Sequence, residues 1–587
     1  MILPVFKTGE RRVRPVAGAF DSHTLPPILR SLGLLVAIIV LWASSLGAQS
    51  AAPHPSGIQD ILQYINNGWT ALSRSMDDCK TVVDAKFPAR SLLYVPAGAP
   101  VPSAAREVSQ RCGVSVQALP HEIRTIGTVD MAAIKQPGLL YLPNPYVVPG
   151  GFFNEMYGWD SYFIIRGLLR TGKLDLARGM VENFFYEIEH YGAILNANRS
   201  YFLTRSQPPF LSSMVLAVHE AQLRAGKPDD AWLRRAYDYI VRDHTMWTTG
   251  QKLAGDTGLS RYYDFGEGPA PELYGHNDRY YDAVATWFTK QFDRSRGYLS
   301  TGADSEALPA AWPRYTVQLC GGMTAANPSS AAPCRATSKF SFTADYYRGD
   351  RAMRESGYDV SFRFGPFSGS THHYAALDLN ALLYKAERDL ERIARMLGKD
   401  ADARRWAERA RLRRNAINRL MWDEKKGLYF DYDFVRVRRS DYVFITTFHA
   451  LWTGVASPKQ AERIASNLRL FEHPGGLVTS LTETKVQWDY PWGWAPNQLI
   501  AVEGLRRYRY NSDADRVALK FLSTVLTNFR RDGTIREKYN VVARTSTAEI
   551  QAGYKENVVR IRLDERRVPR IAPPTPACLP RSPRRAC

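Results

Sequence analysis

Apolar residues recur at helical spacing along most of this chain after residue 160. Strand-like alternation is rare and short, for example at 428–432. Long loops rich in glycine, proline and aromatic residues separate the helical segments, at 145–160, 192–210, 255–279, 296–365 and 470–496. The pattern predicts amphipathic helices over residues 174–191, 211–225, 229–248, 280–293, 378–397, 400–422, 458–468, 497–508 and 514–532.

Many helices joined by elaborated loops favour an all-α toroid whose long loops form a pocket at one end. No internal repeat is visible, so this expectation rests on the type of element alone. Residues 53–140 show a weaker pattern, with one helix expected near 58–76 and no sign of a flexible linker. We therefore expect this segment to pack against the helical body.

The formal net charge of +19 suggests a nucleic-acid or anionic-surface partner, but its distribution weakens that interpretation. Residues 1–52 contribute +3 and residues 560–587 contribute +6, which leaves +10 for about 500 residues. No stripe of lysine and arginine alternates with aromatic residues that could stack on bases. Nucleic-acid binding is therefore not expected.

The first 52 residues have the layout of a signal peptide. Arginines precede the apolar run 32–43, and small residues follow it at 44–52. The run is too short to span a bilayer comfortably, so we expect cleavage near 48–52 and no membrane span in the mature chain. The expected location is periplasmic or secreted.

Export would permit disulfides, and two pairs are plausible. Cys79 can pair with Cys112, and a bond between Cys320 and Cys334 would close a loop rich in glycine, alanine and proline. None of the six cysteines has the spacing of a zinc site. We expect neither a metal nor another cofactor.

Residues 149–162 place carboxylates and aromatic rings together after a Pro-Gly-Gly turn and before a helix. Such a loop suits a sugar, because rings cover the apolar face of a pyranose and carboxylates accept its hydroxyl protons. Cleavage of a glycosidic bond requires one carboxylic acid and one carboxylate. Similar stretches, each with candidate acids or amides, occur at 192–209, 267–272, 355–364, 487–498 and 535–540.

Two of these stretches resemble the signatures of the trehalases, which are inverting glycosidases with an (α/α)6 barrel. They are 149–162 and the sequence Gln-Trp-Asp-Tyr-Pro-Trp-Gly-Trp-Ala-Pro at 487–496, and the similarity extends from about 80 to 559. The resemblance implies a catalytic domain over 53–559 that hydrolyses trehalose to glucose as a monomer, without a cofactor.

The same resemblance assigns roles to individual residues. Asp359, in Ser-Gly-Tyr-Asp, is the implied general acid, and Glu537, in Glu-Lys-Tyr, is the implied general base. Inversion implies a separation of roughly 6.5–9.5 Å between their carboxyl groups, with Asp359 protonated and Glu537 ionised beside Lys538 or an arginine. The implied substrate contacts are Trp159, Asp160, Asn196, Arg205, Ser206, Gln207, Glu272 and Gly357.

Three positions depart from the family pattern. Phe152 and Ala270 stand where trehalases have arginines, and Trp492 replaces an asparagine. Each lost guanidinium removes charge-assisted hydrogen bonds of about 1.5–3 kcal/mol. Either Arg363 and Arg261 substitute for them, or the preferred substrate is another α-glucoside.

Structural roles are the alternative for several of these acids. Asp359 and Glu537 could be helix caps or members of salt bridges, and Asp160 and Asp489 could pair with an arginine, Arg199 or Arg363. The tryptophans of 488–494 fit a core role as well as a sugar platform.

Two further classes of function stay open beside an enzyme. The chain could be an inactive sugar-binding paralogue, or its charge could bind an anionic surface. The pair His372-His373 suggests a metal, but adjacent residues on a helix or strand rarely face one ion, so this interpretation is disfavoured.

The C-terminal residues differ most from the family. Trehalases carry Gly-Phe-Gly-Trp-Thr-Asn-Gly-Val near their end, where this chain has 560–568. Written in codons as GGA TTC GGC TGG ACG AAC GGC GTG and read from the third base, that segment becomes Ile-Arg-Leu-Asp-Glu-Arg-Arg, the sequence at 561–567. We hypothesise that the reading frame shifts at or just before residue 560, which makes 560–587 a disordered, out-of-frame tail.

Overall fold

The computed structural model describes residues 57–547 except 85, 88–89, 274–278, 291–296, 302–306, 310–311 and 321–333. The segment 1–52 and the tail 560–587 therefore lie outside the described residues. Within the described part, none of the helices is both long enough and apolar enough to cross a membrane.

All of the predicted helices are present, and their ends agree with the prediction to within a turn, except that the helix expected near 58–76 ends at Ala71. Local chemistry explains some of these ends. At the start of the helix over 458–466, the Ser457 hydroxyl accepts from the Gln460 N–H and the Gln460 side chain accepts from the Ser457 N–H. At the start of the helix over 230–247, the Asp229 carboxylate accepts from the Trp232 N–H. The helices of the body are α5 (Gly158–Arg170), α6 (Leu174–His190), α7 (Leu211–Arg224), α8 (Asp230–Trp247), α9 (Arg279–Lys290), α11 (Ala344–Glu355), α12 (Leu377–Met396), α13 (Asp400–Met421), α14 (Thr447–Thr453), α15 (Pro458–Ser466), α16 (Leu468–Phe471), α17 (Ala495–Arg507) and α18 (Asn511–Asp532).

Helices alternate between an inner ring and an outer layer. Along the ring α5 packs on α7, α7 on α12, α12 on α14 and α14 on α17. Arg166 of α5 then pairs with Glu503 of α17 at 2.7 Å and joins the first and last of these five helices. Outside them lie α6, α8, α13, α15 and α18, each against its neighbour in sequence, while α9 and α11 pack together through aromatic side chains. The fold is an all-α (α/α)6 barrel, as expected.

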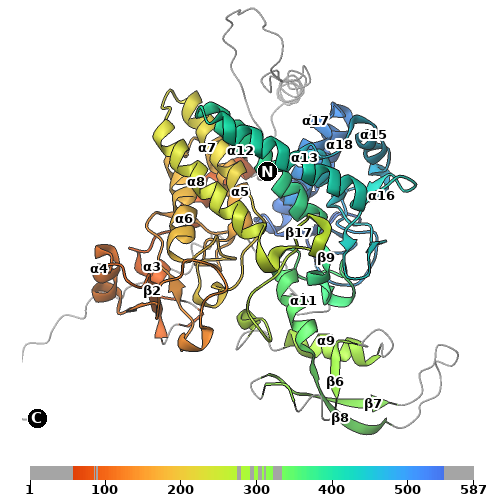
Figure 1. The fold of residues 1–587 in the computed structure, drawn as a ribbon, viewed down its shortest axis with the longest axis horizontal. Coiled ribbons are helices and arrows are strands. Elements are labelled where there is room, and N and C mark those ends of the chain that lie inside the picture. Colours follow the sequence, from red (N-terminus) through yellow and green to blue (C-terminus); the bar gives the residue numbers. More distant parts are fainter. Residues whose placement is uncertain are drawn as a thin grey trace, which may run out of the picture.

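The segment 296–365, predicted to be a loop, contains both a helix and a hairpin. The apolar signal of α11 is weak because the face that it buries mixes a few apolar residues with charged ones, among them Asp350, Arg351 and Arg354. Thr343 caps it by accepting from the Tyr346 N–H at 3.2 Å. Figure 1 shows the sheet β6–β8 projecting below α9 and α11 at the edge of the molecule.

The strands are short and mostly join loops around the barrel. Three-stranded sheets have the orders β3-β2-β4, β6-β8-β7 and β13-β12-β9, and the two-stranded pairs are β1-β5, β10-β11, β14-β15 and β16-β17. Their bounds are β1 Ser73–Arg74, β2 Leu92–Val95, β3 Ser115–Ala118, β4 Leu139–Leu140, β5 Tyr146–Val147, β6 Leu299–Thr301, β7 Tyr315–Cys320, β8 Cys334–Phe342, β9 Tyr374–Ala375, β10 Trp422–Asp423, β11 Leu428–Tyr429, β12 Tyr432–Asp433, β13 Arg438–Arg439, β14 Glu472–His473, β15 Gly476–Leu477, β16 Trp492–Trp494 and β17 Lys538–Asn540.

The N-terminal segment contacts the barrel through a helix and a small sheet. Its helices are α2 (Ile58–Ala71), α3 (Cys79–Val82) and α4 (Ser103–Cys112). On α2, the Tyr64 ring lies 5.0 Å from the Phe529 ring of α18.

One of the two expected disulfides is present. Cys79 and Cys112 are bonded and tie α3 to α4, which confirms that prediction. Cys320 and Cys334 are paired residues of β7 and β8, but their side chains lie outside what the structure describes.

Candidate active site

Three sequence stretches meet at the first turn of α5. The Trp159 N–H donates to Gln207 Oε1 at 2.9 Å, and the Gly158 N–H donates to the Asn196 carbonyl at 3.2 Å. The Asn196 N–H in turn donates to the Arg205 carbonyl at 2.8 Å. These backbone bonds place Trp159, Asn196, Arg205 and Gln207 in one cluster, although the sequence spreads them over nearly fifty residues.

Asp359 joins this cluster through a glycine turn at the end of α11. Gly357 has a φ of +76°, and a Cβ at this position would lie 2.8 Å from the Trp159 ring. Only glycine tolerates both the backbone conformation and the contact. The neighbouring Tyr358 ring lies 5.6 Å from Trp159, so the turn holds the residue before Asp359 against the opening loop.

A group of charged side chains lies beside Asp359. Arg205 Nη2 pairs with Glu272 Oε1 at 2.7 Å, and Arg354 Nη1 lies 3.6 Å from the same oxygen. Burial would raise the pKa of Glu272, but the two guanidinium groups hold it below its usual value. We call Arg205, Glu272 and Arg354 the arginine–glutamate cluster.

This cluster has unused hydrogen-bonding capacity. Arg205 Nε and Nη1 and Glu272 Oε2 are buried, and none has a hydrogen-bond partner among the described residues. Buried polar atoms are nearly always paired, so these atoms point to a polar ligand. Sugar hydroxyls can both donate to the carboxylate and accept from the guanidinium.

The carboxyl group of Asp359 is partly accessible and unusually basic for an aspartate. Burial raises its pKa to about 7, while Arg354 opposes that rise and Glu272 adds to it. At neutral pH a large fraction of Asp359 therefore carries a proton that it can donate.

Glu537 is connected to Asp359 through the second signature. The Trp488 N–H donates to the Val360 carbonyl at 3.1 Å, and the rings of Trp488 and Trp494 stack with their centroids 3.7 Å apart. Trp494 of β16 pairs with Lys538 of β17, the residue next to Glu537. The tryptophans of 488–494 are buried, so they act as the core that links these two segments.

The immediate surroundings of Glu537 include a cation. Lys538 Nζ lies 3.3 Å from Glu537 Oε2, and the Lys538 side chain is buried while that of Glu537 is 24% exposed. An ion pair of this kind contains the ionised carboxylate, which is the form of a proton acceptor.

Of the remaining predicted contacts, Ser206 is held by a buried ion pair. The Ser206 N–H donates to Glu355 Oε1 at 3.0 Å, and the same oxygen accepts from Lys252 Nζ at 2.5 Å. Asp160 lies in the first turn of α5 and is partly exposed.

The expected pairing of Asp489 with Arg199 or Arg363 is not observed. Arg199 binds Asp84 and Glu155, and Arg363 binds Asp378 and Asp431, so neither pairs with Asp489. Instead Asp489 accepts from the Tyr442 and Thr484 hydroxyls and from the Phe362 N–H.

The two arginines expected to compensate for the family's lost cations are also engaged elsewhere. Arg363 is fully buried in its pair of carboxylates, and Arg261 donates to the carbonyls of Gln251 and His372. Arg354 is the cation beside Asp359 instead. Sequence reasoning missed it because it lies on α11, which has few apolar residues among many charged ones.

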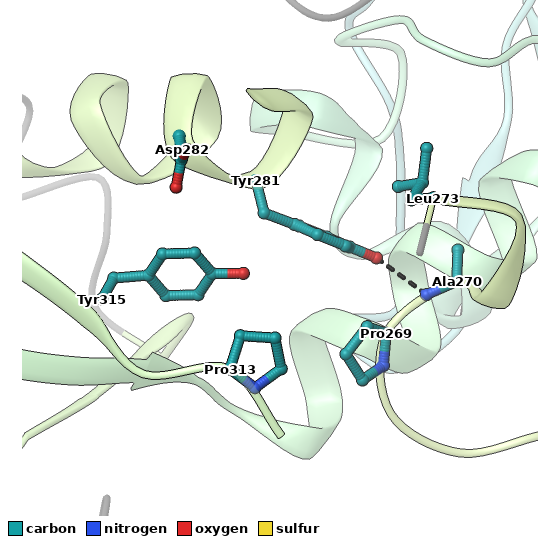
Figure 2. A pocket seen from close by; sticks show the side chains of 7 residues that line it. All are labelled: Pro269, Ala270, Leu273, Tyr281, Asp282, Pro313 and Tyr315. Carbon is teal, nitrogen blue, oxygen red and sulfur yellow. Dashed lines mark hydrogen bonds between the residues drawn. The ribbon is translucent and has the colours of Figure 1, made fainter. Parts of the chain in front are cut away.

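The surroundings of Ala270 show what replaces the family arginine there. Ala270 is fully buried beside a cavity of about 180 Å³, shown in Figure 2, that is also lined by the Tyr281 and Tyr315 rings. The Ala270 N–H donates to the Tyr281 hydroxyl at 2.9 Å, and that hydroxyl donates to Asp350 at 2.8 Å. Asp350 also accepts from Arg354, so this turn is connected to the arginine–glutamate cluster.

The second substituted position faces outward. Phe152 is 67% exposed, and Lys86 Nζ lies 5.7 Å from its ring centroid. The same ammonium group pairs with Glu155 at 2.7 Å.

Comparison with known proteins gives a consistent result. A sequence model of the family described as "Trehalase" matches residues 57–307 and 337–559. The chain is 37% identical over 433 residues to the cytosolic neutral trehalase of Kluyveromyces lactis, covering 70% of this chain and 52% of that protein. It is 34% identical over 546 residues to the cytosolic neutral trehalase of Emericella nidulans, covering 83% and 67%. The chain thus spans about half to two thirds of the length of these curated relatives.

A solved structure supports the same relationship. Neutral trehalase Nth1 from Saccharomyces cerevisiae superposes with a TM-score of 0.68 at 32% identity, covering 82% of this chain and 90% of that structure.

The names of the relatives contradict one expectation. They are described as cytosolic, so the prediction of a signal peptide over 1–52 and of a periplasmic or secreted protein is wrong. Arginines followed by a short apolar run and small residues are a weak signal, since hydrophobicity and charge alone do not prove that a segment directs export.

Proposed function

Since this chain belongs to the trehalase family, we propose that it hydrolyses α,α-trehalose to two glucose molecules with inversion. Asp359 is the general acid that protonates the glycosidic oxygen, and Glu537 is the general base that takes a proton from the attacking water. The observation that carries the proposal is the position of Asp359 beside the arginine–glutamate cluster, where Arg205 Nη1 and Glu272 Oε2 are buried without a hydrogen-bond partner among the described residues.

The division of roles between the two acids follows from their surroundings. A pKa of about 7 lets Asp359 keep its proton into the neutral range and donate it to the leaving oxygen. Glu537 pairs with Lys538 in its ionised form, which can accept a proton. Inversion requires room for a water molecule between base and anomeric carbon, hence about 6.5–9.5 Å between the carboxyl groups.

The other predicted contacts complete the proposed substrate site. The Trp159 ring offers an apolar face to a pyranose, and the arginine–glutamate cluster binds hydroxyl groups. Ser206 and Gly357 contribute backbone atoms, since the Ser206 hydroxyl already donates to the Ile194 carbonyl. The full set of proposed contacts is Trp159, Asp160, Asn196, Arg205, Ser206, Gln207, Glu272 and Gly357.

The loss of two family arginines favours a second candidate, the same mechanism on another α-glucoside. Ala270 adjoins an apolar cavity and Phe152 is exposed, so each position presents carbon where a guanidinium would bind hydroxyls. A third candidate is a sugar-binding paralogue without activity. We further propose a cytosolic, monomeric protein, following the names of its relatives for the location.

Glucose release separates these candidates. Purified protein is assayed on trehalose, maltose and kojibiose, together with Asp359→Asn and Glu537→Gln and the exposed controls Asp441→Asn and Glu462→Gln. We expect activity on trehalose, a loss of about 10²–10⁴-fold in kcat for the two active-site variants, and unchanged controls.

The other outcomes also have a clear meaning. Faster turnover of maltose or kojibiose supports the other α-glucoside. Sugar binding without turnover by the unmodified protein supports the paralogue. Full activity of folded Asp359→Asn contradicts the assigned acid.

A further inference from the structure

Three side chains with metal-binding atoms meet where α11 begins. Asp345 lies in the first turn of α11, and His372 and His373 lie in η9, a short 3₁₀ helix (Thr371–His373). Asp345 Oδ1 is 2.9 Å from His372 Nε2 and 3.4 Å from His373 Nε2. One ligand atom from each residue lies within 4.8 Å of the other two.

The structure removes the objection that adjacent histidines point apart. In η9 the two imidazole rings lie with centroids 4.0 Å apart, and both Nε2 atoms face α11. The backbone at both residues is fixed, because Arg261 donates to the His372 carbonyl at 2.9 Å and the Phe434 N–H donates to the His373 carbonyl at 3.1 Å. The convergence is therefore built into the fold of the turn.

The donor set selects the class of cation. Two imidazoles and one carboxylate suit zinc and related divalent transition metals, whereas calcium and magnesium take oxygen ligands. Zinc bonds of about 2.0–2.1 Å in a tetrahedron place neighbouring ligand atoms roughly 3.3 Å apart. The 3.4 Å separation already matches, and the 2.9 Å hydrogen bond has to open by a few tenths of an ångström.

The surroundings keep the ligands available. The His372 side chain is 4% exposed, so the protein holds this imidazole in place beside Asp345. In the metal-free protein His372 Nε2 donates to Asp345 Oδ1, so a cation bound at Nε2 takes the place of that proton and releases it. Side-chain exposures of 48% for Asp345 and 23% for His373 leave one side open to a water ligand.

We propose that Asp345, His372 and His373 bind one Zn²⁺ or related divalent transition-metal ion, with solvent as the remaining ligand. The bound cation links the start of α11 to η9. α11 continues from Asp345 to Glu355, and Asp359 follows four residues later. The cation therefore stabilises the support of the proposed active site without touching substrate. This site does not depend on the proposed reaction.

The full-length protein provides the test. After treatment with a chelator and dialysis, it is titrated with Zn²⁺, Co²⁺ and Ca²⁺ by calorimetry, and the Co²⁺ complex is measured by visible absorption. We expect one bound Zn²⁺ or Co²⁺ per chain, an absorption band of nitrogen-ligated Co²⁺, and a melting temperature that rises with Zn²⁺ concentration.

Two variants and a matched control locate the binding. Asp345→Asn keeps the shape of the side chain, and His373→Ala removes a partly exposed ring. Loss of a residue that only supports a metal ligand lowers metal affinity by roughly 10–100-fold. We expect the loss of a ligand itself, in either variant, to weaken Zn²⁺ binding by at least as much. His473→Ala is the control, since this partly buried histidine packs on Tyr490 and belongs to β14, and we expect the variant to bind Zn²⁺ like the unmodified protein.

Circular dichroism shows whether each variant folds. A folded Asp345→Asn with unchanged Zn²⁺ binding overturns the proposal, as does equal affinity for Ca²⁺ or no binding of Zn²⁺ by the unmodified protein. If His373→Ala does not fold, Asp345→Asn alone decides.

Discussion

At the scale of single residues, Gly357 shows how narrow the tolerance of the candidate site is. Its positive φ already disfavours any side chain, and the Trp159 ring occupies the place of a Cβ. Both constraints act on the turn that positions Asp359.

We predict that Gly357→Ala loses activity by more than its backbone strain accounts for. Movement of the Trp159 ring disturbs the aromatic face of the site, so kcat/KM on trehalose falls at least tenfold, because a displacement of about 1 Å can cost about 10²-fold. Steady-state kinetics measure the change. Gly533→Ala is the matched control, with a φ of +65° and no atom within 4 Å of its Cβ; an equal effect of both substitutions would contradict the role of the ring contact.

At the scale of elements, α11 organises much of the site although few of its residues are apolar. Its buried face carries Asp350, Arg354 and Glu355, which bind Tyr281, Glu272 and Lys252 respectively. A helix that buries ion pairs beside a few aromatic side chains gives only a weak apolar pattern, so the sequence did not predict it. The helices with more continuous apolar faces were predicted.

We predict that α11 sets the upper limit of the pH range in which the protein is active. Asp359 acts in its protonated form and its pKa is about 7, so kcat/KM falls as the pH rises above about 7. Arg354 stabilises the carboxylate, so Arg354→Gln raises that pKa and moves the fall to higher pH. Arg348→Gln on the same helix is the control, since Arg348 donates to the Tyr263 hydroxyl; a shift to lower pH in Arg354→Gln would refute the argument.

At the scale of the whole molecule, a buried ion cluster joins the N-terminal segment to the barrel. Arg199 Nη1 lies 2.6 Å from Asp84, and Arg199 Nε lies 2.5 Å from Glu155. Burial would raise the pKa of Glu155, but Arg199 and Lys86 hold it at about 2. The stabilisation that Glu155 gains from its cations is complete above about 4.5, the pKa of its carboxyl group in the unfolded chain. It is lost as the pH falls towards 2.

We predict that Arg199→Met destabilises the protein by about 3–5 kcal/mol at neutral pH, because it leaves buried carboxylates without their main partner. Urea denaturation measures the change in the free energy of unfolding. Arg411→Met, which breaks an exposed pair with Glu408, should leave this free energy almost unchanged. Similar losses for the two variants would show that burial does not set the cost.

The proposed frame shift also concerns the whole chain. The family match ends at residue 559, next to the position where an out-of-frame reading reproduces 561–567. We predict that resequencing the gene across the codons for residues 558–561 finds one missing or extra base. An unchanged reading frame there would exclude the hypothesis.

The sequence by itself determined the helices with apolar faces, the (α/α)6 class and the family, because periodicity and signature motifs are local properties. Tertiary structure alone decided which charges meet. Arg354 lies beside Glu272, two histidines face Asp345, and β16 brings Lys538 next to Trp494 through contacts between residues far apart in the chain. The partners of Arg354 (Glu272 and Asp350) and of Arg363 (Asp378 and Asp431) follow from packing in three dimensions, which no local spacing records.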